Sequence, residues 1–354
     1  SVSIPSPSAL QYPCRYPVSR ISHPVSRTMP LTVYYPSIEP DLLTDLQAQL
    51  DPGVRIISGP DLPAESDYEV LITGRPTREQ LAASPRLRAV VVPWAGVPET
   101  MRDLVPDFPH VEVHNLHHNA DATAELAFAL LLAAAKRVVP LDQKLRDGDW
   151  SARYGSSETV LLHSKTALIL GYGSIGQRVA RYCHALGMTL LATRRDPTKD
   201  ANDDLPVELH LPDALRDLLP RAEVLVVTLP LTSETEGLIG RRELDLLPDN
   251  AILVNVGRGP IVDQQALFDA LRDGRMHSAG LDVWYNYPEG EEARAHTLPA
   301  DVPFHTLENI VMSPHRGGDT MDTDRLRMAD LARILNAASR GEPMPNRVDL
   351  EAGY

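Results

Sequence analysis

The sequence predicts an α/β protein with two lobes, each built on a doubly wound parallel sheet, with the second lobe inserted into the first. Short apolar strands alternate with helices from residue 31 to residue 312, which is typical of parallel βαβ units. A long Ala/Leu-rich helix at Ala120–Val139 separates two such series, and a last helix at Asp322–Ser339 is long enough to return to the first. The 354 residues suffice for two domains with separate cores.

The elements expected in the first lobe lie between Pro, Gly and Asp breakers. A helix at Asp41–Leu50 has apolar residues at helical spacing and ends before Pro52 and Gly53. The strands of this lobe are expected at Leu31–Tyr35, Val54–Ile57, Val70–Ile72 and Ala89–Val92.

The second lobe repeats the alternation of strands and helices. Two of its helices are expected at Gln177–Leu186 and Gln264–Arg272. Its strands are expected at Lys165–Leu170, Leu190–Ala192, Glu223–Thr228, Ala251–Val256, Ala279–Val283 and Ile310–Met312.

Composition limits the partners and the compartment. The formal charge of −14 argues against nucleic acid and anionic membrane, since both are also negative. The longest apolar run, Leu126–Ala135, is far shorter than the roughly 20 residues that span a bilayer. Two cysteines, Cys14 and Cys183, make no disulfide framework, so a reducing, cytoplasmic setting is expected.

The first 28 residues differ from the rest of the chain. They contain five prolines and seven serines but no acidic residue, and they lack the apolar stretch of a secretory signal. We therefore expect a disordered leader over residues 1–28, with Met29 as the natural start.

A glycine-rich turn follows the strand that ends at Leu170. It has the pattern G-x-G-x-x-G and leads into a helix, which is the setting of a dinucleotide-binding turn. Its glycines allow a tight turn, close approach of backbone N–H groups to a pyrophosphate, and close helix–strand packing. The residues expected to bind the cofactor here are Gly171, Tyr172, Gly173, Ser174, Ile175 and Gly176.

The end of the next strand predicts the cofactor type. Where a carboxylate would bind the ribose 2′-hydroxyl of NAD, this chain has Thr193, Arg194 and Arg195. Guanidinium groups form charge-assisted bonds to a 2′-phosphate. We therefore expect Arg194 and Arg195 to favour NADP, with NAD as the alternative.

Three further stretches follow the turn in a specific order: Asn255–Asp263, Gly280–Trp284 and Met312–Gly318. Together with Val227–Thr232 and Asn119–Glu125, they make the chain resemble the D-isomer-specific 2-hydroxyacid dehydrogenase family over about residues 31 to 340. The resemblance implies two Rossmann-like lobes. A dinucleotide-binding domain would comprise residues 119–314, and a substrate domain would comprise residues 29–118 plus 315–354.

The resemblance also implies roles for individual residues. On the cofactor side it points to Thr228, Pro230, Val256, Gly257 and Asp282. On the substrate side it points to the loop Trp94, Ala95 and Gly96, and to His117 and Asn119 in the cleft between the lobes. A segment similar to the family's dimer arm, Trp150–Leu162, implies a homodimer.

Two residues suit the reduction of a 2-oxo acid by their own chemistry. Arg258 follows an apolar strand between two glycines, and its fork of donors can hold a carboxylate and polarise a ketone. His315 follows Pro314 on a loop, and an imidazole that titrates near neutral pH can protonate the forming alkoxide. The family resemblance implies the same roles.

The chain departs from the family pattern at one place. Tyr287 stands where the family has a Glu that pairs with the catalytic His, and a tyrosine hydroxyl supplies no charge near neutral pH. A nearby acid, among Glu289, Glu291 and Glu292, is an alternative partner for His315. The formate dehydrogenase branch, by resemblance, has a neutral amide here and transfers hydride without a proton.

The sequence thus predicts an NAD(P)-dependent oxidoreductase that interconverts a small 2-oxo acid and a D-2-hydroxy acid, with Arg258, His315 and Tyr287 in the catalytic site. Formate-dehydrogenase-like hydride transfer is one alternative, and a non-catalytic, nucleotide-sensing interaction protein is the other. Four histidines within nine residues (His110, His114, His117 and His118) lack the acids or cysteines of a metal site, so no metal is expected.

Overall fold

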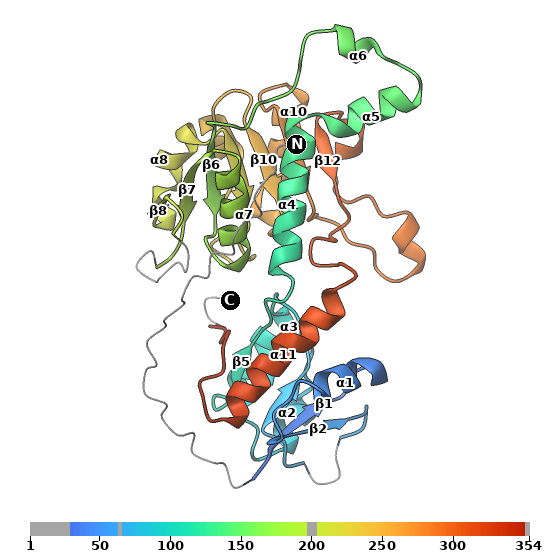
Figure 1. The fold of residues 1–354 in the computed structure, drawn as a ribbon, viewed down its shortest axis with the longest axis vertical. Coiled ribbons are helices and arrows are strands. Elements are labelled where there is room, and N and C mark those ends of the chain that lie inside the picture. The colour runs from blue at the N-terminus through green and yellow to red at the C-terminus, as the bar shows by residue number, and fades with distance from the viewer. Residues whose placement is uncertain (1–28, 63–65, 197–203, 351–354) are drawn as a thin grey trace, which may run out of the picture.

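A computed structural model describes residues 29–62, 66–196 and 204–350. Figure 1 shows two lobes, each with a parallel sheet and flanking helices, joined by long crossing segments. The prediction of an α/β fold with two doubly wound parallel sheets is therefore confirmed. The leader expected at residues 1–28, with Cys14, lies outside the described residues.

The first lobe contains a five-stranded parallel sheet with the strand order β2-β1-β3-β4-β5. Strands β1, β3 and β4 are wholly buried, as expected for a parallel sheet with helices on both faces. The strands are β1 (Leu31–Tyr35), β2 (Val54–Ser58), β3 (Val70–Ile72), β4 (Ala89–Val91) and β5 (Glu112–His114).

The helices of this lobe include one from the far end of the chain. Helix α11 packs against α1, and its apolar residues from Met328 to Ala338 share a core with Leu31 and Val33 of β1. This return of the chain is what inserts the second lobe into the first (Figure 1). The helices are α1 (Pro40–Gln47), α2 (Arg78–Ala83), α3 (Glu99–Leu104) and α11 (Thr323–Ser339).

The second lobe contains a seven-stranded parallel sheet with the order β12-β11-β10-β9-β6-β7-β8. The chain runs outward from β6 through β7 to β8 and then returns to the other side of β6 as β9. The direction of strand order therefore reverses between β6 and β9, and ligands of such sheets bind at this topological switch point. The strands are β6 (Thr166–Leu170), β7 (Thr189–Thr193), β8 (Val207–His210), β9 (Val224–Val227), β10 (Ile252–Asn255), β11 (Ser278–Leu281) and β12 (Ile310–Met312).

Helix α4 lies against this sheet and leads from one lobe to the other (Figure 1). Its approach to β11 requires a glycine, because a Cβ on Gly280 would lie 2.8 Å from Cβ of Leu130. The helices are α4 (Ala120–Ala135), α5 (Val138–Arg146), α6 (Ser151–Tyr154), α7 (Ser174–Ala185), α8 (Leu215–Leu218), α9 (Arg241–Leu246) and α10 (Gln264–Arg272).

The structure differs from the sequence prediction in several places. The helix predicted at Ala120–Val139 ends at Ala135, because Arg137 adopts a left-handed conformation (φ 54°) and α5 then leaves in a new direction. Strand β8 was not predicted; it lies at the sheet edge, and its sequence Val-Glu-Leu-His is not the continuous apolar run of the buried strands. Within the described ranges, no helix combines the length and apolarity needed to cross a bilayer.

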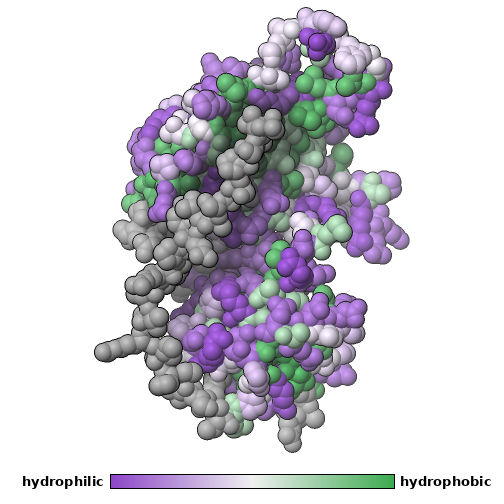
Figure 2. All heavy atoms as spheres, viewed as in Figure 1, coloured by the Kyte–Doolittle hydropathy of each residue, from purple (hydrophilic) through white to green (hydrophobic). Residues whose placement is uncertain are grey.

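Figure 2 shows a mostly hydrophilic surface where the two lobes meet. It also shows apolar residues near the upper end, where α5 leaves the second lobe (Figures 1 and 2). In both sheets, parallel strands bring their carboxyl ends to a common edge. The predicted functional residues follow these strand ends, so the site is built where the two edges face each other.

Candidate active site

The glycine turn joins β6 to α7. Gly171 has φ 95°, and a Cβ on Gly176 would lie 2.1 Å from the carbonyl oxygen of Gly171, so neither position accommodates a side chain easily. A Cβ on Gly173, by contrast, would meet nothing within 4 Å, and α7 begins at the next residue. The turn therefore leaves open space above backbone N–H groups at a helix start, which fits the pyrophosphate of a dinucleotide.

Thr228, Tyr172 and Ile175, which the sequence predicts at the cofactor site, hold the glycine turn in place through hydrogen bonds and packing. The hydroxyl of Thr228 donates to the carbonyl oxygens of Leu170 (3.0 Å) and Gly171 (2.7 Å) and so fixes the strand-to-turn transition. The Tyr172 side chain is 1% exposed and packs in the core, and Ile175 packs against the same cluster. Any contact of Tyr172 with a cofactor must therefore come from its backbone.

A second wall of this cleft follows β9 and β10. Val256 is buried directly after β10. A Cβ on Gly257 would lie 2.5 Å from the carbonyl oxygen of Leu229, so these two segments touch through their backbones. Pro230, next to Leu229, is partly exposed at the same edge.

Arg194 and Arg195 lie beside the turn, directly after β7. The N–H of Tyr172 donates to the carbonyl oxygen of Thr193 (2.9 Å), which ties the end of β7 to the turn. Arg194 is partly exposed and Arg195 is exposed, and no carboxylate occupies positions 193 to 195. This edge is therefore suited to an anionic group such as a 2′-phosphate.

Arg258 extends from the second lobe to the first. Its backbone is held by Asn255, whose amide donates to the Arg258 carbonyl oxygen (2.9 Å) and whose Oδ1 accepts from the N–H of Gly257 (3.0 Å). The guanidinium lies against Gly96, where a Cβ would be 2.6 Å from Nη2. Burial of the guanidinium lowers the pKa of Arg258, but a shifted arginine still remains charged.

The loop that carries His315 is organised by Asp282. This carboxylate is 1% exposed and accepts hydrogen bonds from Ser313 Oγ (2.6 Å) and from the backbone N–H groups of Arg316 and Gly317 (both 2.8 Å). His315 itself adopts a left-handed conformation (φ 57°), which is unfavourable for a non-glycine residue. Asp282 therefore acts in this structure as an anchor that holds His315 in an unusual backbone position.

The hydroxyl of Tyr287 is the partner of His315. Its oxygen lies 2.8 Å from Nδ1 of His315 and also accepts a hydrogen bond from the N–H of Trp284 (3.2 Å). Glu291 pairs with Arg294 instead, and Glu289 and Glu292 are exposed. Of the alternatives raised by the sequence, the structure places Tyr287 against the imidazole.

The electrostatics of the three groups are coupled. Desolvation of the ring lowers the pKa of His315, the positive charge of Arg258 lowers it further, and Asp282 acts in the opposite direction. Burial raises the pKa of Tyr287, so its hydroxyl stays protonated near neutral pH. His315 is therefore close enough to Arg258 for its pKa to be lowered by that charge, and its partner at Nδ1 is the neutral hydroxyl of Tyr287.

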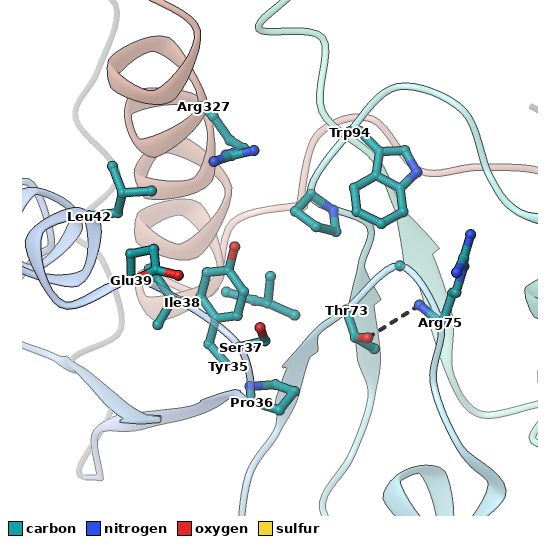
Figure 3. Close-up of a pocket in the computed structure, with 13 residues that line it drawn as sticks. Tyr35, Pro36, Ser37, Ile38, Glu39, Leu42, Thr73, Arg75, Trp94 and Arg327 are labelled. Atoms are coloured by element: carbon teal, nitrogen blue, oxygen red, sulfur yellow. Dashed lines mark hydrogen bonds between the residues drawn. The ribbon is translucent and has the colours of Figure 1, made fainter. Parts of the chain in front are cut away.

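On the first lobe, the loop after β4 faces Arg258. The amide of Asn115 donates to the carbonyl oxygen of Ala95 (2.6 Å), and the N–H of Leu116 donates to that of Trp94 (3.2 Å). The Trp94 indole lies over Gly74, where a Cβ would overlap the ring at 1.9 Å. Trp94 also forms one wall of a pocket at this edge of the sheet (Figure 3). No local sequence pattern indicated the role of Asn115.

His117 and Asn119 contact other elements than the substrate loop. Nδ1 of His117 lies 2.9 Å from Oγ of Ser174 in the glycine turn, and its backbone N–H donates to Asp330 of α11 (2.7 Å). The side chain of Asn119 lies against Gly318, where a Cβ would be 2.8 Å from Nδ2. These contacts link the two lobes, and sequence spacing could not have indicated them.

The clustered histidines have separate surroundings. His114 is buried, with Nδ1 2.9 Å from the carbonyl oxygen of Pro345, whereas the ring of His110 packs near Phe108. Burial lowers the pKa of His118, as does the nearby Arg327. Across the part of the chain that the structure describes, no three His, Cys, Asp or Glu side chains group as metal ligands would.

Comparison with known proteins gives a consistent result. Residues 128–317 match the family model of the D-isomer specific 2-hydroxyacid dehydrogenase NAD binding domain. The chain is 37% identical over 287 residues to a glyoxylate reductase of Aeropyrum pernix, with 79% of this chain and 82% of that protein covered. It is 34% identical over 323 residues to a glyoxylate/hydroxypyruvate reductase B of Yersinia pestis, with coverages of 87% and 94%.

The fold has a close match among solved structures. A D-isomer specific 2-hydroxyacid dehydrogenase from Xanthobacter autotrophicus Py2, in complex with NADPH and MES, superposes with a TM-score of 0.74 at 26% identity. The match covers 92% of this chain and all of that one.

Proposed function

The chain belongs to the D-isomer specific 2-hydroxyacid dehydrogenase family, and on that premise we propose that it reduces a small 2-oxo acid to the D-2-hydroxy acid with a hydride from NADPH or NADH. Its class is that of an NAD(P)-dependent oxidoreductase acting on the CH–OH group of donors. The observation that carries the proposal is the position of Arg258, whose guanidinium contacts the Gly96 loop and whose positive charge lowers the pKa of His315.

Arg258 binds and polarises the substrate in this proposal. Its Nη1 donates a hydrogen bond to the Gly257 carbonyl oxygen (2.7 Å), and the remaining guanidinium N–H groups are the donors for a ligand. The substrate carboxylate would lie between the guanidinium and the backbone of the Gly96 loop, and the ketone oxygen would accept a further guanidinium N–H. In this orientation the ketone would lie near His315, whose pKa the charge of Arg258 lowers.

His315 supplies the proton. When the carbonyl carbon gains a hydride, the carbonyl oxygen becomes an alkoxide and takes the proton from Nε2 of His315. Tyr287 lies against Nδ1, which leaves Nε2 for the substrate, and Asp282 holds the loop on which His315 has its left-handed backbone. In the reverse direction, neutral His315 would accept the hydroxyl proton.

The glycine turn is the proposed binding place of the dinucleotide, with Gly173 and Ser174 at the pyrophosphate and with Arg194 and Arg195 at a 2′-phosphate. The bound nicotinamide supplies the hydride. We propose that NADPH is preferred, because positions 193 to 195 offer cations and no carboxylate.

Two further proposals concern setting and assembly. The thiol of Cys183 is free and buried, which suits a reducing cytoplasm. The segment 150–162 carries exposed Trp150, Tyr154 and Leu161, which suit contact with a second copy of the chain. We propose a homodimer in the cytoplasm.

The test is consumption of NADPH and of NADH in the presence of glyoxylate, hydroxypyruvate and pyruvate. We expect oxidation of the reduced cofactor with at least one of these acids and a higher kcat/KM for NADPH. Loss of turnover in Arg258→Ala, with folding retained by circular dichroism, would support the assigned site. Binding of NADPH without turnover of any acid would contradict the proposed reaction.

One observation favours a second candidate, hydride transfer from formate without acid–base catalysis. The partner of His315 is a neutral hydroxyl, which does not stabilise an imidazolium as a carboxylate would. Formation of NADPH or NADH from formate, without activity toward 2-oxo acids, would select this candidate.

A further inference from the structure

A pocket of about 370 Å³ lies beside the proposed catalytic site, at the carboxyl edge of the first sheet. It is bounded by the ends of β1, β3 and β4 and by helices α1 and α11 (Figure 3). Its lining residues are Tyr35, Pro36, Ser37, Ile38, Glu39, Leu42, Ile72, Thr73, Gly74, Arg75, Pro93, Trp94 and Arg327. The few atoms of glyoxylate cannot fill such a volume.

We propose that this pocket binds the side chain of the substrate and that the substrate is a 2-oxo acid whose chain ends in a second carboxylate. The inference rests on the proposed function. It names the class of acid that the Arg258 site would reduce.

The pocket adjoins the site through a shared loop. Trp94 forms one wall of the pocket, and Gly96, two residues further on, contacts the guanidinium of Arg258. Two residues of chain span at most about 7 Å. The pocket wall and the Arg258 contact therefore belong to one short loop, and a substrate chain that passes Trp94 would enter the pocket.

The far end of the pocket offers two donors to an anion. Tyr35 is 7% exposed, and its hydroxyl points toward Arg327 across the pocket (Figure 3). Among the described residues, none forms a hydrogen bond with this hydroxyl. Arg327 projects from α11, and one of its terminal nitrogens pairs with Asp324. Its planar fork has further N–H groups for a carboxylate. Burial raises the pKa of Tyr35, so the hydroxyl remains a donor.

Much of the pocket lining is apolar. Its apolar lining residues are Ile38, Leu42, Ile72, Pro93 and Trp94, and the polar Ser37 and Thr73 also line it. Such a lining suits a chain of methylene groups and not a hydrated polar one. The pocket therefore combines a partly apolar lining with an end that offers hydrogen-bond donors, as a dicarboxylic 2-oxo acid requires.

The charges of the pocket are not all positive. Glu39 also lines it and is exposed at the outer side, while Arg75 is exposed near Trp94. With Asp324, which pairs with Arg327, two carboxylates balance the two arginines, so the free N–H groups of Arg327 and the Tyr35 hydroxyl, and not a net positive charge, would hold a distal carboxylate. Removing the charge in Glu39→Gln should strengthen binding of a distal carboxylate by a few-fold.

The decisive comparison uses substrates of equal length that differ only at the distal end. We expect kcat/KM to be higher for 2-oxoglutarate than for 2-oxovalerate, and for 2-oxoadipate than for 2-oxohexanoate. Arg327→Ala should lower kcat/KM for the diacids by roughly 10- to 100-fold, the usual effect of losing a hydrogen bond to a charged group. It should leave the monoacids and glyoxylate nearly unchanged.

Three variants make the result specific. Tyr35→Phe should lower diacid turnover by a few-fold, and Arg327→Lys should retain part of it because it keeps the charge. Arg325→Ala is the matched control, since Arg325 lies on the same helix, is 68% exposed and pairs with Asp322. It should leave the diacid-to-monoacid ratio unchanged.

The outcomes separate this inference from the proposed function. If glyoxylate is reduced but the diacid-to-monoacid ratio is the same in the wild-type chain and in Arg327→Ala, the side-chain pocket is refuted and the reaction stands. An equal loss for diacids, monoacids and glyoxylate in Arg327→Ala also refutes it. If no 2-oxo acid is reduced at all, the proposed function itself fails.

Discussion

The hydroxyl oxygen of Tyr287 lies 2.8 Å from Nδ1 of His315, at the place where the family resemblance implies a carboxylate. The oxygen also accepts the N–H of Trp284, so the Tyr287 ring is fixed by the backbone. The imidazole therefore has an oriented but uncharged partner. Its proton affinity is set mainly by desolvation and by Arg258.

This relationship predicts an unusual pH dependence. Reduction needs protonated His315, and desolvation and Arg258 place the pKa of His315 below its ordinary value of 6.5. The protonated fraction is therefore lost as pH rises through that lowered pKa, and reduction should be fastest on the acidic side. Tyr287→Glu should move the alkaline limb of the kcat/KM profile upward by about 1 pH unit or more, since a nearby carboxylate favours the imidazolium.

Tyr287→Phe is the matched variant, because it removes the hydrogen bond without adding charge. We expect a several-fold loss of kcat and no upward movement of the limb. A profile identical to that of the wild-type chain in both variants would mean that position 287 does not influence His315.

Asp282 offers a test of the loop that carries His315. Asn at this position has a single acceptor oxygen, and its NH₂ would face a backbone N–H of Arg316 or Gly317. At 1% exposure the mismatch should cost about 1–3 kcal/mol, so the melting temperature should fall and kcat with it. Asp319→Asn is the control, since Asp319 is exposed and pairs with Arg316 on the same loop. Equal melting temperatures for the two variants would contradict the anchoring role.

The fold could be predicted because its signals are local. The strand at Thr166–Leu170 is a largely apolar run, and the glycine turn follows it directly. The hydrophobic pattern and the position of the glycines were therefore enough to predict both elements. Strand β8 lies at the sheet edge and carries polar residues at every second position, so it lacks the apolar run that marked the other strands.

The site could be predicted less completely because several of its contacts join distant segments. The motifs indicated Arg258 and His315, but Asp282 reaches a loop about thirty residues away, and His117 reaches Ser174 across 57 positions. The pocket combines β1 with α11, from opposite ends of the chain. Such pairs depend on the packing of whole lobes, which no local pattern records.

The cofactor edge predicts a change in selectivity. Replacing Arg194 and Arg195 together by Ala should raise the KM for NADPH by roughly 10- to 100-fold, because a charge-assisted bond to phosphate is lost. The KM for NADH, which has no 2′-phosphate, should change little. Arg241→Ala on α9, whose arginine pairs with Asp269, serves as the control. Parallel losses for NADPH and NADH would place the arginines outside the 2′-phosphate site.

The contact between His117 and Ser174 predicts where a histidine substitution will act. His117→Ala removes one neutral hydrogen bond to the glycine turn, worth about 0.5–1.5 kcal/mol. The KM for NADPH should rise by about 2- to 10-fold, while the KM for the 2-oxo acid should stay within two-fold. A raised KM for the 2-oxo acid with an unchanged KM for NADPH would instead support the substrate-binding role that the sequence predicts for His117.

The segment between α5 and β6 predicts the assembly state. Trp150 is 60% exposed, Tyr154 81% and Leu161 67%, which is a large apolar surface for a segment that leaves the body of the lobe. Light scattering should give twice the chain mass of 38.9 kDa. Charges in Tyr154→Glu with Leu161→Glu should weaken the dimer by at least roughly 100-fold, since each buried apolar side chain contributes about 1.5–3 kcal/mol. Leu211→Glu, at another exposed apolar residue of the same lobe, should leave the mass unchanged. A monomeric wild-type chain at micromolar concentration would show that this surface is not an interface between copies.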